Sequence, residues 1–132
     1  MVIVDTCVWS LALRRDRPKN DAPVRALAAV IEQGFCTLLG PVRQEILSGV
    51  KSPAQFRKLS ESLAGFPNVP LESDDFVSAA ECFNACRKKG IQGANTDFLI
   101  CALSLRLGAQ ILTTDKDFQS FKKVLKIQLL AY

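Results

Sequence analysis

Four of the thirteen acidic residues stand where this sequence passes from one expected element to the next; they are Asp5, Glu45, Asp97 and Asp115. Carboxylate oxygens are hard ligands, and a group of them without histidine or thiolate favours Mg²⁺ or Mn²⁺ over zinc or copper. Such an ion lowers the pKa of a bound water and stabilises a leaving oxygen, which suits phosphoryl chemistry. The chemistry to test is therefore metal-assisted attack on a phosphate ester.

The composition removes the main competing mechanisms. The chain has 132 residues, a formal net charge of +4 and no histidine. Without histidine there is no Ser-His-Asp triad, no Cys-His pair and no histidine general base. An apolar fraction of 48% with 23% charged residues is ordinary globular composition. At roughly 100–200 residues per domain, we expect residues 1–132 to form a single domain.

Short apolar runs predict the strands that must position these acids. The first is Val2–Val4, a β-branched run of the kind that is buried on both faces of a parallel sheet. Similar runs cover 35–39 and 110–113, and 126–130 alternates like an edge strand. The segment 66–71 contains two prolines, so we expect a loop or a short edge strand there.

Helices are expected between these runs, at 7–13, 24–31, 40 to about 49, 52 to near 65, 73–89 and 96–107. The helix from residue 73 is expected to turn inward Phe76, Ala79, Ala80, Phe83 and Cys86. The polar stretch 14–20 is expected to be a loop. Strands alternating with helices predict an α/β sheet with right-handed crossovers.

The strand order predicts where the acids meet. Ligands of such sheets bind beyond the carboxyl ends of the strands, where the following helices begin. Asp5 and Asp115 follow strands, Glu45 lies about one turn into a helix, and Asp97 begins the apolar helix. We therefore expect all four at one edge of the sheet. Two unit charges 4 Å apart repel by about 4 kcal/mol at an effective dielectric of 20, so such a group needs cations or protons.

Each acid also has an ordinary explanation when it is taken alone. Asp5 and Asp97 are well placed to cap the helices that follow them. Glu45 on a helix is more often a solvated residue. Asp115 and Asp117 are common turn residues. Taken together, at one edge of the sheet, they favour a site.

Four segments resemble the PIN domain family in order and spacing: Val4-Asp5-Thr6, Glu45-Ile46-Leu47-Ser48-Gly49, Asp97-Phe98-Leu99-Ile100-Cys101-Ala102 and Leu112-Thr113-Thr114-Asp115-Lys116-Asp117-Phe118. Within that superfamily, the short single-domain chain resembles the VapC-type toxins of bacterial and archaeal toxin–antitoxin systems. The resemblance implies a three-layer α/β/α sandwich with a mostly parallel central sheet of four to five strands. Cys7 and Cys101 depart from the smaller residues that are commoner at these positions.

The resemblance also implies an activity, namely hydrolysis of RNA by a ribonuclease that depends on Mg²⁺ or Mn²⁺. The acids implied as catalytic are Asp5, Glu45, Asp97 and Asp115, and those implied as metal ligands are Asp5, Asp97, Asp115 and Asp117. The hydroxyls of Thr6 and Thr113 match supporting positions. The family further implies a homodimer and a cognate antitoxin that blocks the site.

Other classes of function stay open at this point. The chain can be a PIN fold that holds RNA or a protein without cutting, a nuclease that acts on DNA, or a metal phosphatase. Arg14 and Arg15 are candidates to contact RNA or an acidic partner segment, and Trp9 to pack in a dimer or partner surface. The basic residues are not interleaved with aromatic residues as in a base-stacking platform.

The sequence also predicts a compartment. The longest apolar runs, 26–31 and 98–103, are far shorter than the ~20 residues that span a bilayer, and the amino-terminal segment has no basic region typical of a signal peptide. The five cysteines form no CxxC pair and fall within apolar patterns, as free thiols do in a reducing compartment. We therefore expect a cytoplasmic protein.

Overall fold

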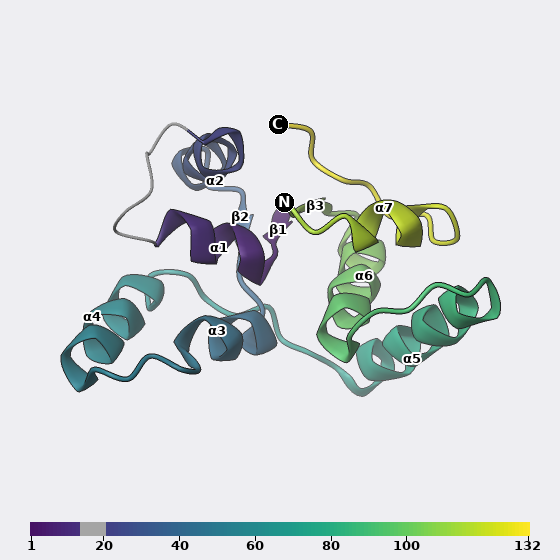
Figure 1. Cartoon of the computed structure of the whole chain (residues 1–132), viewed down its shortest axis with the longest axis horizontal. Coiled ribbons are helices and arrows are strands. Elements are labelled where there is room, and N and C mark those ends of the chain that lie inside the picture. Colours follow the sequence, from purple (N-terminus) through teal and green to yellow (C-terminus); the bar gives the residue numbers. More distant parts are fainter. Residues whose placement is uncertain (14–20) are drawn as a thin grey trace.

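Three short parallel strands form the centre of the computed structural model, which describes residues 1–13 and 21–132 (Figure 1). They are β1 (Val2–Val4), β2 (Cys36–Thr37) and β3 (Gln110–Leu112), in the order β2-β1-β3. Val2 pairs with Cys36 on one side and with Gln110 on the other. All three residues of β1 are buried, as expected for a central strand covered on both faces. The middle strand is thus the first one in the chain.

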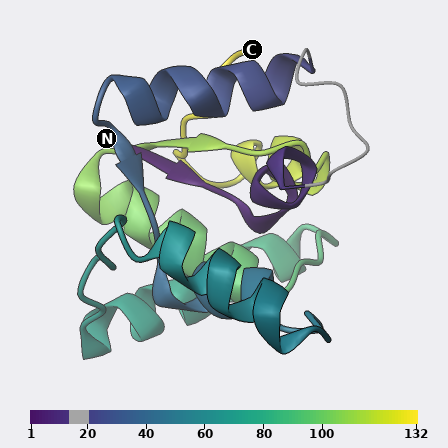
Figure 2. The ribbon, with the colours of Figure 1, turned by 90° about the vertical axis from the view of Figure 1, so that its left-hand side faces the viewer.

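The helices are α1 (Thr6–Ala12), α2 (Ala22–Glu32), α3 (Gly40–Leu47), α4 (Pro53–Leu63), α5 (Ser73–Lys88), α6 (Asn95–Leu107) and α7 (Asp117–Lys122). Figure 2 shows α2 on one side of the sheet and α3, α4 and α6 on the other. The α/β/α layering is therefore confirmed. The expected loop 14–20, with Arg14 and Arg15, lies outside the described residues.

The sheet is smaller than predicted, with three strands in place of four to five. The segments 66–71 and 126–130 each contribute only an isolated parallel bridge, Leu38 with Asn68 and Ile111 with Leu129. In the first segment, Pro67 and Pro70 have no N–H to donate to a ladder. In the second, β3 ends at Leu112, so little strand is left for the tail to pair with.

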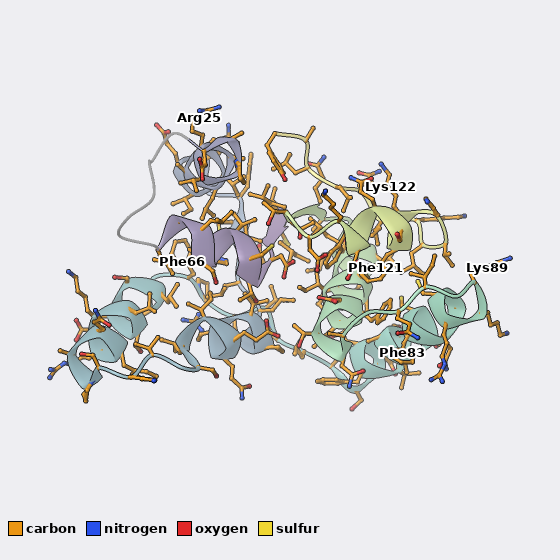
Figure 3. The ribbon with its side chains drawn as sticks, viewed as in Figure 1. Arg25, Phe66, Phe83, Lys89, Phe121 and Lys122 are labelled. Atoms are coloured by element: carbon orange, nitrogen blue, oxygen red, sulfur yellow. The ribbon has the colours of Figure 1, made fainter. Side chains whose placement is uncertain are left out.

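The core is densest around α6, where every side chain from Phe98 to Ser104 is buried. Phe98 makes ring contacts with Phe83 of α5 and Phe121 of α7, at centroid distances of 5.4 and 4.7 Å. In Figure 3, Phe83 and Phe121 approach α6 from these two helices. Gly93 is needed here, because a Cβ atom at this position would lie 2.4 Å from the Phe121 ring. These contacts hold the start of α6, and with it Asp97, in a fixed place.

Two interpretations of apolar residues were wrong. Phe76 is 54% exposed and Ala80 is also exposed, because α5 faces α6 along a narrower stripe than the sequence pattern predicted. Trp9, which was a candidate for a partner surface, is only 4% exposed. Its ring stacks edge-on against Phe66 at a centroid distance of 5.4 Å, so it belongs to the core of this chain. Among the described residues, no helix is long and apolar enough to cross a membrane.

Candidate active site

Asp5 lies at the end of the central strand and is 6% exposed. Its Oδ1 accepts a hydrogen bond from the backbone N–H of Thr6 at 2.8 Å, so it caps α1 as its ordinary explanation predicted. Its Oδ2 accepts one from the hydroxyl of Thr113, which follows β3, also at 2.8 Å. Capping and site building therefore use the same carboxylate.

Thr6 connects this acid to the helix that follows β2. Its hydroxyl donates to Oε2 of Glu45 on α3 at 2.7 Å. Glu45 is exposed, yet this bond links it to a residue 39 positions earlier in the chain. The first residue of α1 thus contacts two acids at once, one through its backbone and one through its side chain.

Thr113 connects Asp5 to the acids beyond β3. Its oxygen, which donates to Asp5, also accepts a hydrogen bond from the backbone N–H of Asp115 at 3.0 Å. Oδ1 of Asp115 then accepts from the backbone N–H of Asp117 at 2.9 Å. A continuous series of hydrogen bonds therefore runs from Glu45 through Thr6, Asp5 and Thr113 to Asp115.

Asp97 comes to this group from a separate direction, in the first turn of α6. Its Oδ2 accepts a hydrogen bond from the backbone N–H of Ala94 at 3.0 Å. Burial, together with the nearby negative charges of Asp5, Asp115 and Glu45, raises the pKa of Asp97 to about 6. Four segments of the chain therefore bring their acids within electrostatic reach of one another.

Asp5 experiences the same environment from the opposite side. Burial raises the pKa of its carboxyl group, and the charge of Asp115 adds to that effect. Hydrogen bonds from Thr113, Cys7 and Thr6 oppose the shift, because they stabilise the charged form. Asp117 is different: it is exposed in the first turn of α7 and is not among the charges that act on Asp5 or Asp97.

Cys7 is the residue at this site that sequence reasoning missed. Its Sγ lies 3.4 Å from Oδ2 of Asp5, and it accepts a hydrogen bond from the backbone N–H of Thr114 at 3.4 Å. The available signal was its place in the first turn of the helix that Asp5 caps. The thiol of Cys7 therefore contacts the buried carboxylate of Asp5.

The donor set suits a hard divalent cation. Every side chain in the hydrogen-bonded series offers oxygen to a ligand, and the sulfur of Cys7 lies beside it. Within residues 1–13 and 21–132, no three acidic or thiol groups are already arranged as a set of metal ligands. The oxygens of Asp5 and one oxygen of Asp97 are occupied by N–H and O–H donors. The acids are thus held by hydrogen bonds within this group and do not already form a set of metal ligands.

The structure thus has a parallel α/β sheet with acids from four segments at its carboxyl edge. A family model described as "PIN domain" matches residues 2–124, and the chain belongs to this family. The chain is 29% identical over 135 residues to proteins named VapC ribonuclease Mb1587, from Mycobacterium bovis, and ribonuclease VapC11, from Mycobacterium tuberculosis. Each alignment covers 100% of this chain and 99% of the relative.

Solved structures share the fold at lower identity. A crystal structure of FitAcB from Neisseria gonorrhoeae matches with a TM-score of 0.76 and 19% identity, over 99% of this chain and 97% of that one. VapBC2 from Rickettsia felis, bound to a DNA fragment from their promoter, matches with a TM-score of 0.74 and 16% identity, over 100% and 99% of the two chains. These likenesses show that the fold is shared over nearly the whole length of each chain.

Proposed function

We propose that this protein is an endoribonuclease toxin that depends on Mg²⁺ or Mn²⁺. The observation that carries the proposal is the convergence of four acids, Asp5, Glu45, Asp97 and Asp115. Besides burial, the charges of the other three raise the pKa of Asp97. A domain without a catalytic duty has little reason to keep mutually repelling acids at the carboxyl edge of its sheet. The relatives named as ribonucleases support RNA as the substrate.

Each acid has a proposed part in this reaction. Asp5, Asp97 and Asp115 would hold the cation, and Asp117, two residues after Asp115, would join them. A bound Mg²⁺ or Mn²⁺ supplies Lewis acidity toward the phosphodiester and lowers the pKa of water. Glu45 would accept a proton from the attacking water, a role supported by its exposure and by the hydrogen bond from Thr6 that orients its carboxylate. The products would carry 3′-hydroxyl and 5′-phosphate ends.

The hydroxyls of Thr6 and Thr113 would hold the acids in place before the cation binds. Each hydroxyl donates to a carboxylate, at 2.7 Å to Glu45 and 2.8 Å to Asp5. Such donors fix the orientation of a ligand and stabilise its charged form. Their removal would weaken metal binding while leaving every acid present.

We also propose that a cognate antitoxin blocks this site and that the toxin is a homodimer. The similarity to VapC relatives and to the VapBC2 structure supports the partner. Size measurement of the purified chain tests the dimer, and a monomer at working concentration would count against it. Inhibition of cleavage by the protein encoded beside this chain tests the antitoxin.

Cleavage of a labelled RNA tests the activity. We expect cleavage with Mn²⁺, none with a chelator, and none by Asp5→Asn. Asp74→Asn is the matched control, because Asp74 is an exposed acid in the first turn of α5. The Asp74→Asn protein should cleave RNA like the wild type. Cleavage that persists in chelator, or an active Asp5→Asn protein that is folded, would refute the proposal. Preference for DNA of the same sequence would instead indicate a DNA nuclease.

A further inference from the structure

A cavity adjoins the acidic group. It has a volume of about 450 Å³, which is within the range of small-ligand sites. It lies between the turn after β3, helix α7 and the segment 129–132, and it is lined by Thr113, Thr114, Asp115, Lys116, Gln119, Lys122, Leu129, Leu130, Ala131 and Tyr132. Thr113 and Asp115 thus belong both to this cavity and to the hydrogen-bonded series of the candidate active site.

Backbone pairing holds the segment 129–132 in this place. The N–H of Ile111 donates to the carbonyl of Gln128 at 2.9 Å, and the N–H of Leu130 donates to the carbonyl of Ile111 at 2.8 Å. This bridge is parallel, so the segment leaves β3 in the direction in which β3 itself runs. Parallel pairing therefore carries Tyr132 toward the edge of the sheet that holds the acids.

The cavity presents two ammonium groups and an aromatic ring, which are groups of the kind that bind a nucleotide. Lys116 and Lys122 are exposed, and neither pairs with a carboxylate among the described residues. Figure 3 labels Lys122 at the outer end of α7, on the side of the molecule along which the segment 129–132 runs. Tyr132 is 56% exposed, so its ring is available to a ligand. Ammonium groups bind phosphates, and an exposed aromatic ring stacks on a base.

The structure thereby changes one conclusion from the sequence, which found no aromatic residue interleaved with the basic ones. Tyr132 lies ten residues beyond Lys122 in the chain, yet the fold sets both in one cavity. Unpaired cations beside a group of repelling acids are also hard to explain as packing. Two lysines and a ring next to Asp115 form the surroundings that a polyanionic strand with bases would need.

We infer that this cavity binds one nucleotide of a single-stranded RNA substrate, adjacent to the phosphate that is cut. Lys116 and Lys122 contact phosphates of the strand, and Tyr132 stacks on the base. This inference rests on the proposed ribonuclease function, and it assigns to that function a binding position and three residues. Stacking tolerates any base, so the subsite sets the position of the strand more than its sequence.

RNA binding to an inactive background tests the subsite separately from cleavage. The Asp97→Asn protein is titrated with a fluorescein-labelled single-stranded RNA of about ten nucleotides, a length in the range of single-strand sites. We expect Tyr132→Ala to weaken binding by roughly five- to a hundredfold, and Tyr132→Phe to bind like the background. Lys122→Gln should weaken binding and reduce the slope of log K against log salt by about 0.7, the loss of one phosphate contact.

Lys123→Gln is the matched control, because Lys123 is exposed beside Lys122 but does not line the cavity. If Tyr132→Ala and Lys122→Gln bind RNA as tightly as Lys123→Gln, the subsite is wrong, even where the wild-type chain cleaves RNA. Tighter binding of DNA than of RNA by the background protein overturns the assignment of RNA. Absence of cleavage by the wild type refutes the proposed function instead, and the binding series still decides whether the cavity holds a strand.

Discussion

Two aspartates of this protein occupy equivalent positions on neighbouring helices and have opposite electrostatic surroundings. Asp75 and Asp97 each lie in the first turn of a helix, α5 and α6. Each accepts a hydrogen bond from a backbone N–H three residues earlier, of Glu72 at 2.8 Å and of Ala94 at 3.0 Å. Local sequence and local geometry therefore do not distinguish them.

The difference lies in what each carboxylate faces. Both oxygens of Asp75 accept hydrogen bonds from the guanidinium of Arg106, at 2.7 and 3.0 Å. The Glu72 N–H, followed by Arg106, lowers the pKa of Asp75 below its ordinary value. Burial and, among the described residues, the charges of other acids raise the pKa of Asp97 to about 6. The charge of Asp75 is balanced by Arg106, whereas Asp97 is a proposed ligand of a cation that the solution supplies.

This contrast separates an acid that is paired inside the fold from one that we propose acts in the active site. A carboxylate with an internal cation adds to stability, and one held among like charges costs stability that a ligand must offset. The same helix-capping bond thus serves both purposes. Substitutions at the two positions should accordingly have effects on different observables.

The largest difference is expected in catalysis. Asp97→Asn should reduce RNA cleavage in Mn²⁺ by roughly a thousandfold or more, because a proposed metal ligand becomes a neutral amide. Asp75→Asn should leave the rate per folded molecule within about twofold of the wild type, since Asp75 lies outside the acidic group. Initial rates at saturating Mn²⁺ measure both. Comparable losses in the two folded variants would remove the distinction.

A smaller effect is expected in stability, where Asp75→Asn should be the more damaging of the two substitutions. Asp75→Asn should lower the melting temperature by roughly 4–8 °C, because Arg106 loses its charged partner. Asp97→Asn should hold or raise it, since it relieves repulsion from Asp5, Asp115 and Glu45. Thermal unfolding by circular dichroism in chelator measures both. A destabilised Asp97→Asn protein would show that its capping bond outweighs the repulsion.

The smallest difference is expected in the acid range, where other carboxylates titrate as well. The folded pKa of Asp75 is below its ordinary value of 3.8, so its stabilising contribution is complete above that pH and is lost as pH falls through the folded pKa. The wild type should therefore lose stability below about pH 4 more steeply than Asp75→Asn. Urea unfolding at pH 3 to 5 measures this. Parallel curves would contradict it.

Much of this fold could be predicted from the sequence. Val2–Val4 and 110–113 contain continuous apolar residues because parallel strands are buried on both faces, and α6 is apolar because helices and sheet surround it. The number of strands could not be predicted. The segment 126–130 does pair with β3, but only through one bridge. The extent of this pairing depends on where β3 ends, and β3 ends at Leu112.

The site was predictable in part for a similar reason. The four acids follow from strand order, since the carboxyl ends of parallel strands share an edge. The sulfur of Cys7 behind Asp5, the ring of Tyr132 beside Lys122, and the pairing of Asp75 with Arg106 do not follow from it. Each depends on side chains from segments whose relative rotation is set by packing. A sequence pattern does not predict that rotation.

The central position of β1 has a consequence for how this protein is made. Its first strand leaves the ribosome early, but one of its two neighbours in the sheet ends only at residue 112. Asp5 and Asp115 therefore remain unconnected until the chain has been synthesised past Thr113, because Thr113 joins them. Long-range pairing of this kind forms late, after most of the chain entropy has been lost. The acids of this site can therefore come together only after Thr113 has left the ribosome.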